Sequence, residues 1–476
     1  MDFLMSDILT HPQEKHKAFI ASPRKHVLMI TNHGIHQWKI IPGLPDTGGQ
    51  NVFVNQFTQA LANLGFKITI VNRGGYPHPV TGEWRRGIHY KDQHQRILYL
   101  EDGFPEFVRK EDMHERMPHL VVSLERFLEA EETNVDLMIS HYWDGAKLGV
   151  LYNKSRQERV KHVWVPHSLG AIKKRNVPRE RWAGLRIDER IATERSLIPE
   201  LDGIAATSSA IEQALKQDYG YTTPPLFLPP CVDTDRYHPR EVSEEDSVWD
   251  FLSQRSGEGG EAALSPEEVR GCKIVTEISR TDTTKRKDVL IKAFAKAHQR
   301  VPNSLLVVSI DDSQEELAGE LEHLIQALHL QDHIAVVGFV WELLPTLYAV
   351  TDIYCTPSVM EGFGMSAQEA AATGVPVVAS HLVPFVTEYL LGKDVEKVQF
   401  EGGRQPLKLG DGAMVVQADD VDGFAYALEM LLSNDDLRKT MGQSAYHVTV
   451  PYFTWQNKVT TFLKEIGINF ESPGVR

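Results

Sequence analysis

Short apolar segments that alternate with amphipathic helical segments restrict the fold of this chain more than any other feature. Segments of this kind lie at 26–31, 67–73, 137–140, 163–165 and 203–206 in the first half, and at 273–279, 304–311, 334–340, 352–358 and 375–380 in the second half. Strands that are separated by helices form parallel sheets with helices on both faces. The pattern therefore predicts an α/β protein.

The chain length predicts two such sheets rather than one. A chain of 476 residues is too long for a single hydrophobic core. The proline-rich segment "PPLFLPPCVDTDRYHP" (224–239) interrupts the alternation and marks a domain boundary. We expect a Rossmann-like N-terminal domain over 1–228 and a second over 229–451, facing each other across a cleft. The amphipathic helix within 452–476 could pack back on the first domain.

Composition argues against several kinds of partner and location. The formal net charge of -15 disfavours nucleic acid and anionic membranes as partners. Three cysteines, odd in number and without metal-ligand spacing, fit a reducing compartment. The N-terminus resembles no secretory signal, and no apolar run is long enough to span a membrane. We expect a cytoplasmic protein.

Two strand-to-helix junctions carry residues suited to anions. "LPDTGGQ" (44–50) places adjacent glycines before a helix, where backbone N–H groups can approach a phosphate, although such a pair is also typical of an ordinary tight turn. "SRTDTTKRKD" (279–288) places Arg280 and Lys285 after a strand, where two cations could hold a pyrophosphate. A solvated basic surface is the alternative for this second junction.

A third junction, "EGFGMSAQEA" (361–370), holds two glutamates eight residues apart. Glu361 precedes a Gly-Phe-Gly turn, and Glu369 lies within the helix that follows. Gly362 and Gly364 expose backbone N–H groups at the start of that helix. Carboxylates accept hydrogen bonds from vicinal diols, so the pair could hold two sugar rings, although an exposed helical position would equally account for Glu369.

These residues together resemble the retaining glycosyltransferases of the two-domain GT-B type, within family 4. The two glutamates followed by "TGVPVVAS" (373–380) match that family's signature. Short N-terminal motifs are similar to those of sucrose-phosphate synthases: "HG" (33–34), "DTGGQ" (46–50), "HYWDG" (141–145), "HSLGA" (167–171) and "ATSSAIE" (206–212). The resemblance implies hexose transfer from a nucleoside diphosphate sugar to a sugar phosphate.

The resemblance also implies a role for individual residues. The implied catalytic residues are His167, Arg280, Lys285 and Glu361; the implied donor-binding residues are Gly49, Val337, Phe339, Phe363, Gly364, Met365, Ser366 and Glu369; the implied acceptor-binding residues are Gly48, Gln50, Lys173 and Arg190. Arg280 and Lys285 would neutralise the diphosphate, Glu369 would hold the ribose, and Arg190 would bind the acceptor phosphate. No metal or cofactor is implied beyond the nucleotide sugar.

The chain departs from the family pattern at several positions. Gly362 stands where the family has proline, and "SHLVPFVTEYLLG" (380–392) replaces a glycine-rich stretch. Glu106 lies near the position expected for a lysine that binds the acceptor phosphate, with Arg109 and Lys110 just beyond it. UDP-glucose and fructose 6-phosphate are the favoured substrates, and a mannosylfructose-phosphate synthase, or another enzyme that makes compatible solutes from GDP-mannose or another donor, is the alternative.

Functions from other classes fit the motifs less well. A UDP-sugar epimerase would need no acceptor loop such as "HSLGA", and a non-catalytic sugar-nucleotide sensor would be expected to have lost Glu361 or Lys285. The expected partners are small molecules, with neither nucleic acid nor a membrane, and a phosphatase that acts on the product is conceivable.

Overall fold

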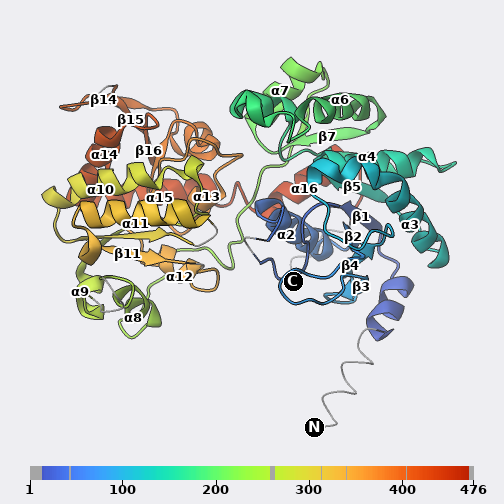
Figure 1. Cartoon of the computed structure of the whole chain (residues 1–476), viewed down its shortest axis with the longest axis horizontal. Helices are drawn as coiled ribbons and strands as arrows, with labels where there is room; N and C mark the ends of the chain where they lie inside the picture. The colour runs from blue at the N-terminus through green and yellow to red at the C-terminus, as the bar shows by residue number, and fades with distance from the viewer. Residues whose placement is uncertain are drawn as a thin grey trace, which may run out of the picture. The chain divides into compact units, whose positions relative to one another are not determined.

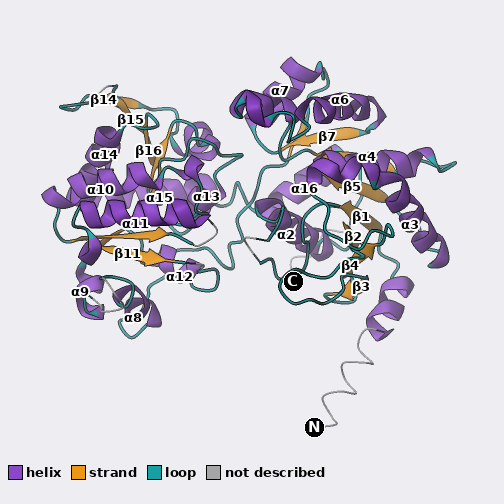
Figure 2. Cartoon of the chain, in the orientation of Figure 1, coloured by secondary structure: helices purple, strands orange, loops and turns teal. Residues whose placement is uncertain are grey.

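The protein is described by a computed structural model that covers residues 13–41, 44–257, 263–311, 314–338, 340–403 and 405–470. The chain divides into two compact units. The first runs to Pro230 and resumes at Trp455, and the second is Cys231–Thr454 (Figure 1). Each unit is an α/β structure with helices on both faces of one sheet (Figure 2), which confirms the predicted fold class.

The sheet of the first unit has eight strands in the order β3-β4-β2-β1-β5-β6-β7-β8, and β3 is antiparallel to β4 whereas the other neighbouring pairs are parallel. The strands are β1 (His26–Ile30), β2 (Lys67–Arg73), β3 (Gly87–Tyr90), β4 (Gln95–Leu100), β5 (Leu137–His141), β6 (Lys161–Val165), β7 (Gly203–Ala206) and β8 (Leu226–Phe227). The order reverses between β1 and β5, and ligands bind at such a reversal in open α/β sheets.

The helices of the first unit follow its strands in the predicted alternation. They are α2 (Gly49–Asn63), α3 (Met117–Ala130), α4 (Tyr142–Lys154), α5 (Gly170–Asn176), α6 (Ile187–Leu197), α7 (Ser209–Tyr219) and α16 (Trp455–Glu465), with 3-10 turns η1 (Lys110–Glu115), η2 (Arg179–Arg181) and η3 (Ile198–Glu200). The C-terminal helix α16 packs on α2: the ring of Trp455 stacks on Phe57 with centroids 5.7 Å apart (Figure 1).

The sheet of the second unit also has eight strands, in the order β11-β10-β9-β12-β13-β16-β15-β14. They are β9 (Lys273–Glu277), β10 (Ser304–Ser309), β11 (Ile334–Val337), β12 (Ile353–Thr356), β13 (Val377–Ser380), β14 (Glu396–Val398), β15 (Leu407–Leu409) and β16 (Ala413–Val416). The edge pairs β14–β15 and β15–β16 are antiparallel. The order reverses between β9 and β12.

The helices of the second unit are α8 (Ser247–Ser253), α9 (Pro266–Gly271), α10 (Lys287–Arg300), α11 (Glu315–Ala327), α12 (Leu344–Ala349), α13 (Met365–Ala372), α14 (Val421–Ser433) and α15 (Asp435–Thr449), with shorter turns η4 (Thr283–Lys285), η6 (Gln331–His333) and η7 (Val386–Leu390). Side chains alternate between the two faces of the sheet: Leu305 and Val307 belong to one apolar cluster, and Leu306 and Val308 to the other. Burial on both faces explains the continuous apolar runs of the central strands.

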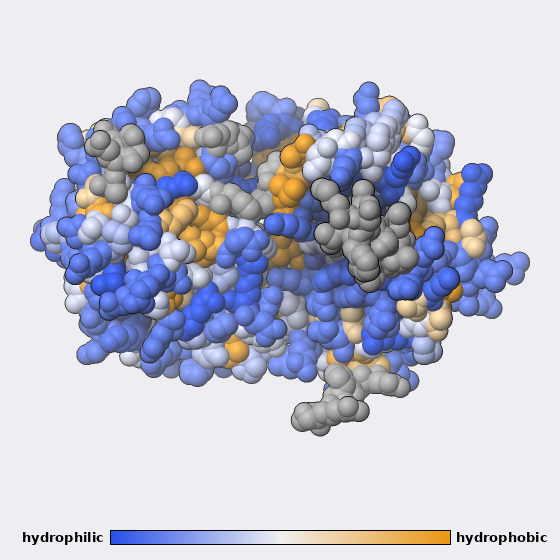
Figure 3. Space-filling view, turned by 90° about the horizontal axis from the view of Figure 1, so that it is seen from below, coloured by the Kyte–Doolittle hydropathy of each residue, from blue (hydrophilic) through white to orange (hydrophobic). Residues whose placement is uncertain are grey.

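Some strands had no sequence prediction, namely β3, β4, β8 and β14 to β16. All of these except β4 lie at sheet edges or are two to four residues long, so they carry little periodic signal. The surface of the protein is typical of a chain in which about a quarter of the residues are charged. The face seen in Figure 3 is largely hydrophilic, with apolar residues in small separate groups. In the part of the chain that the structure describes, no helix combines the length and apolarity required to cross a membrane.

Candidate active site

The second unit brings a predicted cation and a predicted carboxylate into direct contact. Lys285 follows β9 and Glu361 follows β12, the two strands at which the sheet order reverses. The Lys285 Nζ atom donates to Glu361 Oε1 at 2.5 Å. The backbone fixes this meeting, because Val359 N–H donates to the carbonyl of Thr284 at 2.8 Å. Arg280, on the same loop as Lys285, is exposed.

The neighbouring basic residues do not share this site. Lys287 points into the interior, where its ammonium group donates to Glu277 Oε2 at 2.6 Å and to Ser309 Oγ at 3.1 Å. Arg286 pairs instead with Asp288, with Nε 3.0 Å from Oδ1. The basic run therefore separates into Arg280 and Lys285 at the sheet edge, and residues that hold the loop in place.

The helix that begins after Glu361 presents its N-terminus at the same edge. Gly364 caps α13 with φ of 110°, a conformation that other residues rarely adopt, and a Cβ atom there would lie 2.7 Å from Val383 Cγ1. Met365 and Ser366 open the helix and are partly buried. The first N–H groups of a helix have no intrahelical acceptor, so this end can receive an anion.

Glu369 lies one turn into α13 in surroundings that favour its neutral form. Burial raises its pKa to about 8, although the Arg236 guanidinium and the Tyr237 hydroxyl act in the opposite direction. Arg236 itself lies 4.4 Å from the ring centroid of Trp341. The carboxyl group is thus partly desolvated beside the Arg236 cation and the Tyr237 hydroxyl, and these neighbours had no counterpart in the sequence prediction.

Two other predicted donor residues, Phe363 and Val337, have buried side chains. The ring of Phe363 packs in the core, with its centroid 5.4 Å from that of Phe385, so only its backbone could meet a ligand. Val337 ends β11 with its side chain fully buried. Phe339 lies outside the described residues.

In the first unit, His167 occupies a strained turn directly after β6. Its φ of 55° is unusual for a residue with a side chain. Its Nε2 atom is 2.8 Å from His141 Nδ1, and its ring meets Phe53 of α2 edge-on at 4.8 Å. Burial lowers the pKa of His167 to about 3, with nearby His33 adding to the effect, so the imidazole is neutral near pH 7.

The glycine-rich loop before α2 lies beside the end of β1. Gln50 Nε2 donates to Thr31 Oγ1 at 3.1 Å, and Gly48 N–H donates to Asn51 Oδ1 at 2.9 Å. Gly49 is exposed at the first position of α2. Phe53, which touches His167, follows one turn later on the same helix, so these predicted residues belong to one end of the sheet.

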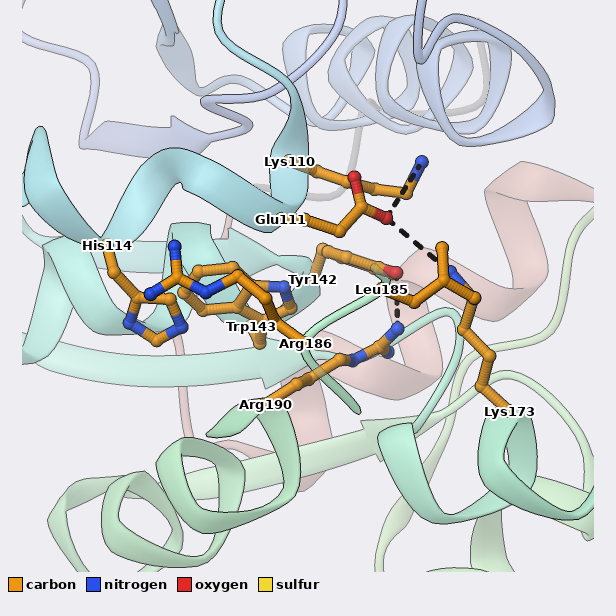
Figure 4. Close-up of a pocket in the computed structure, with 9 residues that line it drawn as sticks. All are labelled: Lys110, Glu111, His114, Tyr142, Trp143, Lys173, Leu185, Arg186 and Arg190. Carbon is orange, nitrogen blue, oxygen red and sulfur yellow. Dashed lines mark hydrogen bonds and ion pairs between the residues drawn. The ribbon is translucent and has the colours of Figure 1, made fainter. Parts of the chain in front are cut away.

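Lys173 and Arg190, both predicted to bind the acceptor, line one pocket of the first unit (Figure 4). The sequence prediction did not include the other lining residues, which are Lys110, Glu111, His114, Tyr142, Trp143, Leu185 and Arg186. Two signals pointed toward them: the basic residues noted after Glu106, and the "HYWDG" motif at 141–145. The lining carries four side chains that are cations at neutral pH and one carboxylate.

Arg190 is buried beside this pocket, and each of its three side-chain nitrogen atoms donates a hydrogen bond. Its Nε atom donates to Glu194 Oε1 at 2.8 Å and its Nη2 atom to the carbonyl of Ser168 at 2.6 Å, while Nη1 donates to the Tyr142 hydroxyl. Glu194 also accepts from Gly170 N–H at 2.9 Å. Arg190 therefore joins α6 to the ends of β5 and β6.

Lys110 connects the pocket to the glycine-rich loop. Its ammonium group pairs with Asp46, and its backbone N–H donates to Asp46 Oδ2 at 3.0 Å. Asp46 lies directly beneath Gly34, whose φ is 73° and where a Cβ atom would clash with the Asp46 carbonyl oxygen at 2.2 Å. Among the described residues, no group of His, Cys, Asp and Glu side chains is arranged to hold a metal.

Two family models match successive parts of the chain. The model described as Glycosyltransferase Family 4 matches residues 47–236, and the model described as Glycosyl transferases group 1 matches residues 265–448. Each of the two α/β units is thus matched over most of its length by a glycosyltransferase model, and the chain belongs to the glycosyltransferases of the GT-B type.

Two curated proteins are similar to this chain over most of its length. The chain is 28% identical over 368 residues to mannosylfructose-phosphate synthase of Agrobacterium fabrum, covering 74% of this chain and 76% of that protein. It is 26% identical over 434 residues to D-inositol 3-phosphate glycosyltransferase of Corynebacterium aurimucosum, covering 88% of this chain and 90% of that protein.

Solved structures share the fold. Sucrose-phosphate synthase from Thermosynechococcus elongatus superposes with a TM-score of 0.71 at 21% identity, covering 93% of this chain and 98% of that chain. Anabaena HepE in complex with UDP and glucose gives a TM-score of 0.64 at 15% identity, covering 93% and 100%. At these identities the likeness establishes the fold and not the substrates.

Proposed function

We propose that this glycosyltransferase moves a hexose from a nucleoside diphosphate sugar to a sugar phosphate, with retention of configuration at the anomeric carbon. UDP-glucose is the favoured donor and fructose 6-phosphate the favoured acceptor. The observation that carries the proposal is the pocket of the first unit, where Lys110, Lys173, Arg186 and Arg190 line one small cavity. Such a concentration of cations suits a dianionic phosphate better than a neutral sugar.

The relatives support a phosphorylated acceptor. The names of the three proteins reported above, mannosylfructose-phosphate synthase, D-inositol 3-phosphate glycosyltransferase and sucrose-phosphate synthase, each contain a phosphorylated sugar or polyol. Mannosylfructose-phosphate synthesis is the second candidate, because that relative covers most of this chain. A mannose donor would distinguish it from the favoured reaction.

On the donor side, the proposed roles follow from the edge of the second sheet. Arg280, Lys285 and the N-terminus of α13 would stabilise the diphosphate as its bond to the anomeric carbon breaks. Glu361 would face the transferred hexose, and Glu369 would accept hydrogen bonds from the nucleotide ribose. Gly364, Met365 and Ser366 would offer backbone N–H groups.

On the acceptor side, Gly48, Gly49 and Gln50 would contact the acceptor and the donor phosphate beside neutral His167. The acceptor hydroxyl oxygen forms the new bond to the anomeric carbon, and its proton passes to the leaving phosphate oxygen on the same face. The product would be a phosphorylated disaccharide, a substrate for a phosphatase. We also propose a cytoplasmic location, since nucleotide sugars of this kind are cytoplasmic metabolites.

A matrix of donors and acceptors tests the proposal. UDP-glucose, GDP-mannose and ADP-glucose are each incubated with fructose 6-phosphate, D-inositol 3-phosphate and fructose, and release of the nucleoside diphosphate is measured. We expect release with one donor and a phosphorylated acceptor, an α-linked product by NMR, and a loss of roughly 100-fold in kcat for Lys285→Ala. Lys292→Ala, an exposed cation on α10, is the matched control. Preference for unphosphorylated fructose, or an inverted linkage, would contradict the proposal.

A further inference from the structure

Glu111 places a carboxylate inside the cationic pocket. Its Oε1 atom lies 3.6 Å from Lys173 Nζ and 3.8 Å from Lys110 Nζ, so one oxygen bridges two ammonium groups that belong to different elements. The side chain is only 9% exposed. Figure 4 shows Glu111 reaching from η1 across the pocket toward Lys173.

The surrounding charges explain why a carboxylate lies there. The pKa of Lys173 is lowered mainly by burial and further by repulsion from Lys110 and Arg190, whereas Glu111 opposes this shift. Without an anion between them, the cations of the pocket would repel one another in a partly desolvated space. Asp46 also pairs with Lys110 and Glu194 with Arg190, and Glu111 supplies the anion that lies between Lys110 and Lys173.

The pocket leaves no room for a second anion beside this one. The cavity measures about 10 Å³, the space of roughly one water molecule. A phosphate group is larger than a water molecule, and it would bring two negative charges next to the Glu111 carboxylate. A ligand phosphate can therefore reach Lys110 and Lys173 only after the carboxylate has left its position between them.

We infer that Glu111 is an internal competitor for the acceptor phosphate: its carboxylate holds Lys110 and Lys173 in the empty pocket and is displaced when a phosphate binds. The inference rests on the proposed function, and it assigns a specificity role to a residue outside the reacting groups. A neutral sugar cannot displace the carboxylate, because it offers the lysines no charge in exchange. A phosphate dianion can, because it brings a greater charge than the group it replaces.

The competition has a direct consequence for binding. Replacing Glu111 with glutamine keeps its shape and removes its charge, so an incoming phosphate no longer competes with it. Inorganic phosphate should then bind more tightly to Glu111→Gln than to the wild-type protein, by roughly tenfold. A residue that merely positioned the lysines would give the opposite result, since its loss would weaken phosphate binding.

Calorimetric titration of inorganic phosphate into the full-length protein tests the inference. The variants are Glu111→Gln, a second uncharged variant Glu111→Thr, and the control Glu115→Gln. Glu115 lies on the same 3-10 turn but is 70% exposed. We expect tighter binding in both Glu111 variants, unchanged binding in the control, and a gain that shrinks when Lys173→Met is added. Thermal unfolding with and without phosphate gives an independent reading.

Each outcome has a separate meaning. Equal or weaker phosphate binding in the Glu111 variants, with clear binding to the wild type, would overturn the inference and leave the proposed function intact. Binding of phosphate to neither protein, together with no use of sugar phosphates as acceptors, would overturn the proposed function and the inference with it.

Discussion

The two glutamates of the candidate donor site have different surroundings. Glu361 and Glu369 stand eight positions apart in the sequence, yet the first is paired with Lys285 and the second is partly desolvated beside Arg236 and Tyr237. Position along the chain does not distinguish the two carboxyl groups. Their surroundings do, because Glu361 forms an ion pair with Lys285 whereas burial favours the neutral form of Glu369.

Glu369 should make nucleotide binding depend on pH. Its pKa of about 8 means that the carboxylate, the form that would accept two ribose hydrogen bonds in the proposed site, becomes predominant only above that pH. The affinity for UDP should therefore rise as the pH increases through about 8. Calorimetric titration between about pH 7 and pH 9, above the titration of the terminal phosphate near pH 6, measures this rise.

The variant Glu369→Gln supplies the control for this effect. It cannot ionise, so its weaker affinity for UDP should be independent of pH over the same range. The same shift implies that wild-type stability falls as the pH rises from 4.5 toward 8, because the folded state retains a proton that the unfolded state releases. If the affinity for UDP depends on pH equally in the wild type and in Glu369→Gln, a group other than Glu369 is responsible.

At the scale of secondary-structure elements, buried ion pairs fix the loops that carry the site. Lys287 and Glu277 are 1% and 0% exposed and tie the start of α10 to the end of β9. Arg190 and Glu194 are 5% and 0% exposed and tie α6 to the ends of β5 and β6. Pairs of this kind contribute little net stability when intact, but leave a buried charge when one partner is removed.

Arg190→Met should thus affect stability and acceptor binding together. Glu194 would remain buried without its guanidinium partner, which costs about 3–5 kcal/mol of unfolding free energy. Adding Glu194→Gln should recover most of that loss, because no unpaired charge remains. The Michaelis constant for the sugar phosphate should stay raised in both variants.

Urea unfolding and steady-state kinetics separate the two effects. If the double variant recovers activity as well as stability, Arg190 acts only as a structural residue. If the single variant is as stable as the wild type, the Arg190–Glu194 pair does not have the buried character that its contacts indicate.

At the scale of the whole molecule, buried histidines should make the stability of the first unit fall in acid. His26, His36, His162 and His167 all belong to the first unit, and burial is the main reason that the pKa of each is lowered to about 3. Below pH 6.5 the unfolded chain binds protons that the folded unit does not. Each histidine should therefore reduce stability by about 1.4 kcal/mol per pH unit as the pH falls toward 3.

Unfolding in urea between about pH 7 and pH 5 checks this expectation. We expect a transition that moves to lower urea as the pH falls, with a shallower pH dependence in His26→Gln. His119→Gln, which alters an exposed histidine on α3, should leave the dependence unchanged. A transition that does not move with pH would show that these histidines are not held neutral.

The sequence by itself determined the α/β class, the central strands and their helices, and the glycosyltransferase class. It could do so because periodicity and strand-end motifs are local: a side chain's place in the repeat reports which face is buried. The motifs also predicted residues that lie together, such as Lys285 with Glu361 and Lys173 with Arg190. Short edge strands such as β14 carry too little periodicity to be predicted.

Only the tertiary structure decided which neighbours in the sequence share a site. Lys285 and Lys287 are two residues apart, but one faces a carboxylate at the sheet edge and the other is buried against Glu277. Glu111 meets Lys173 across more than sixty residues because the loop after β4 and the helix after β6 end at the same edge of one sheet. Charge pairing and desolvation depend on distances through space, and those distances are set by the order of strands in the sheet, which no local pattern encodes.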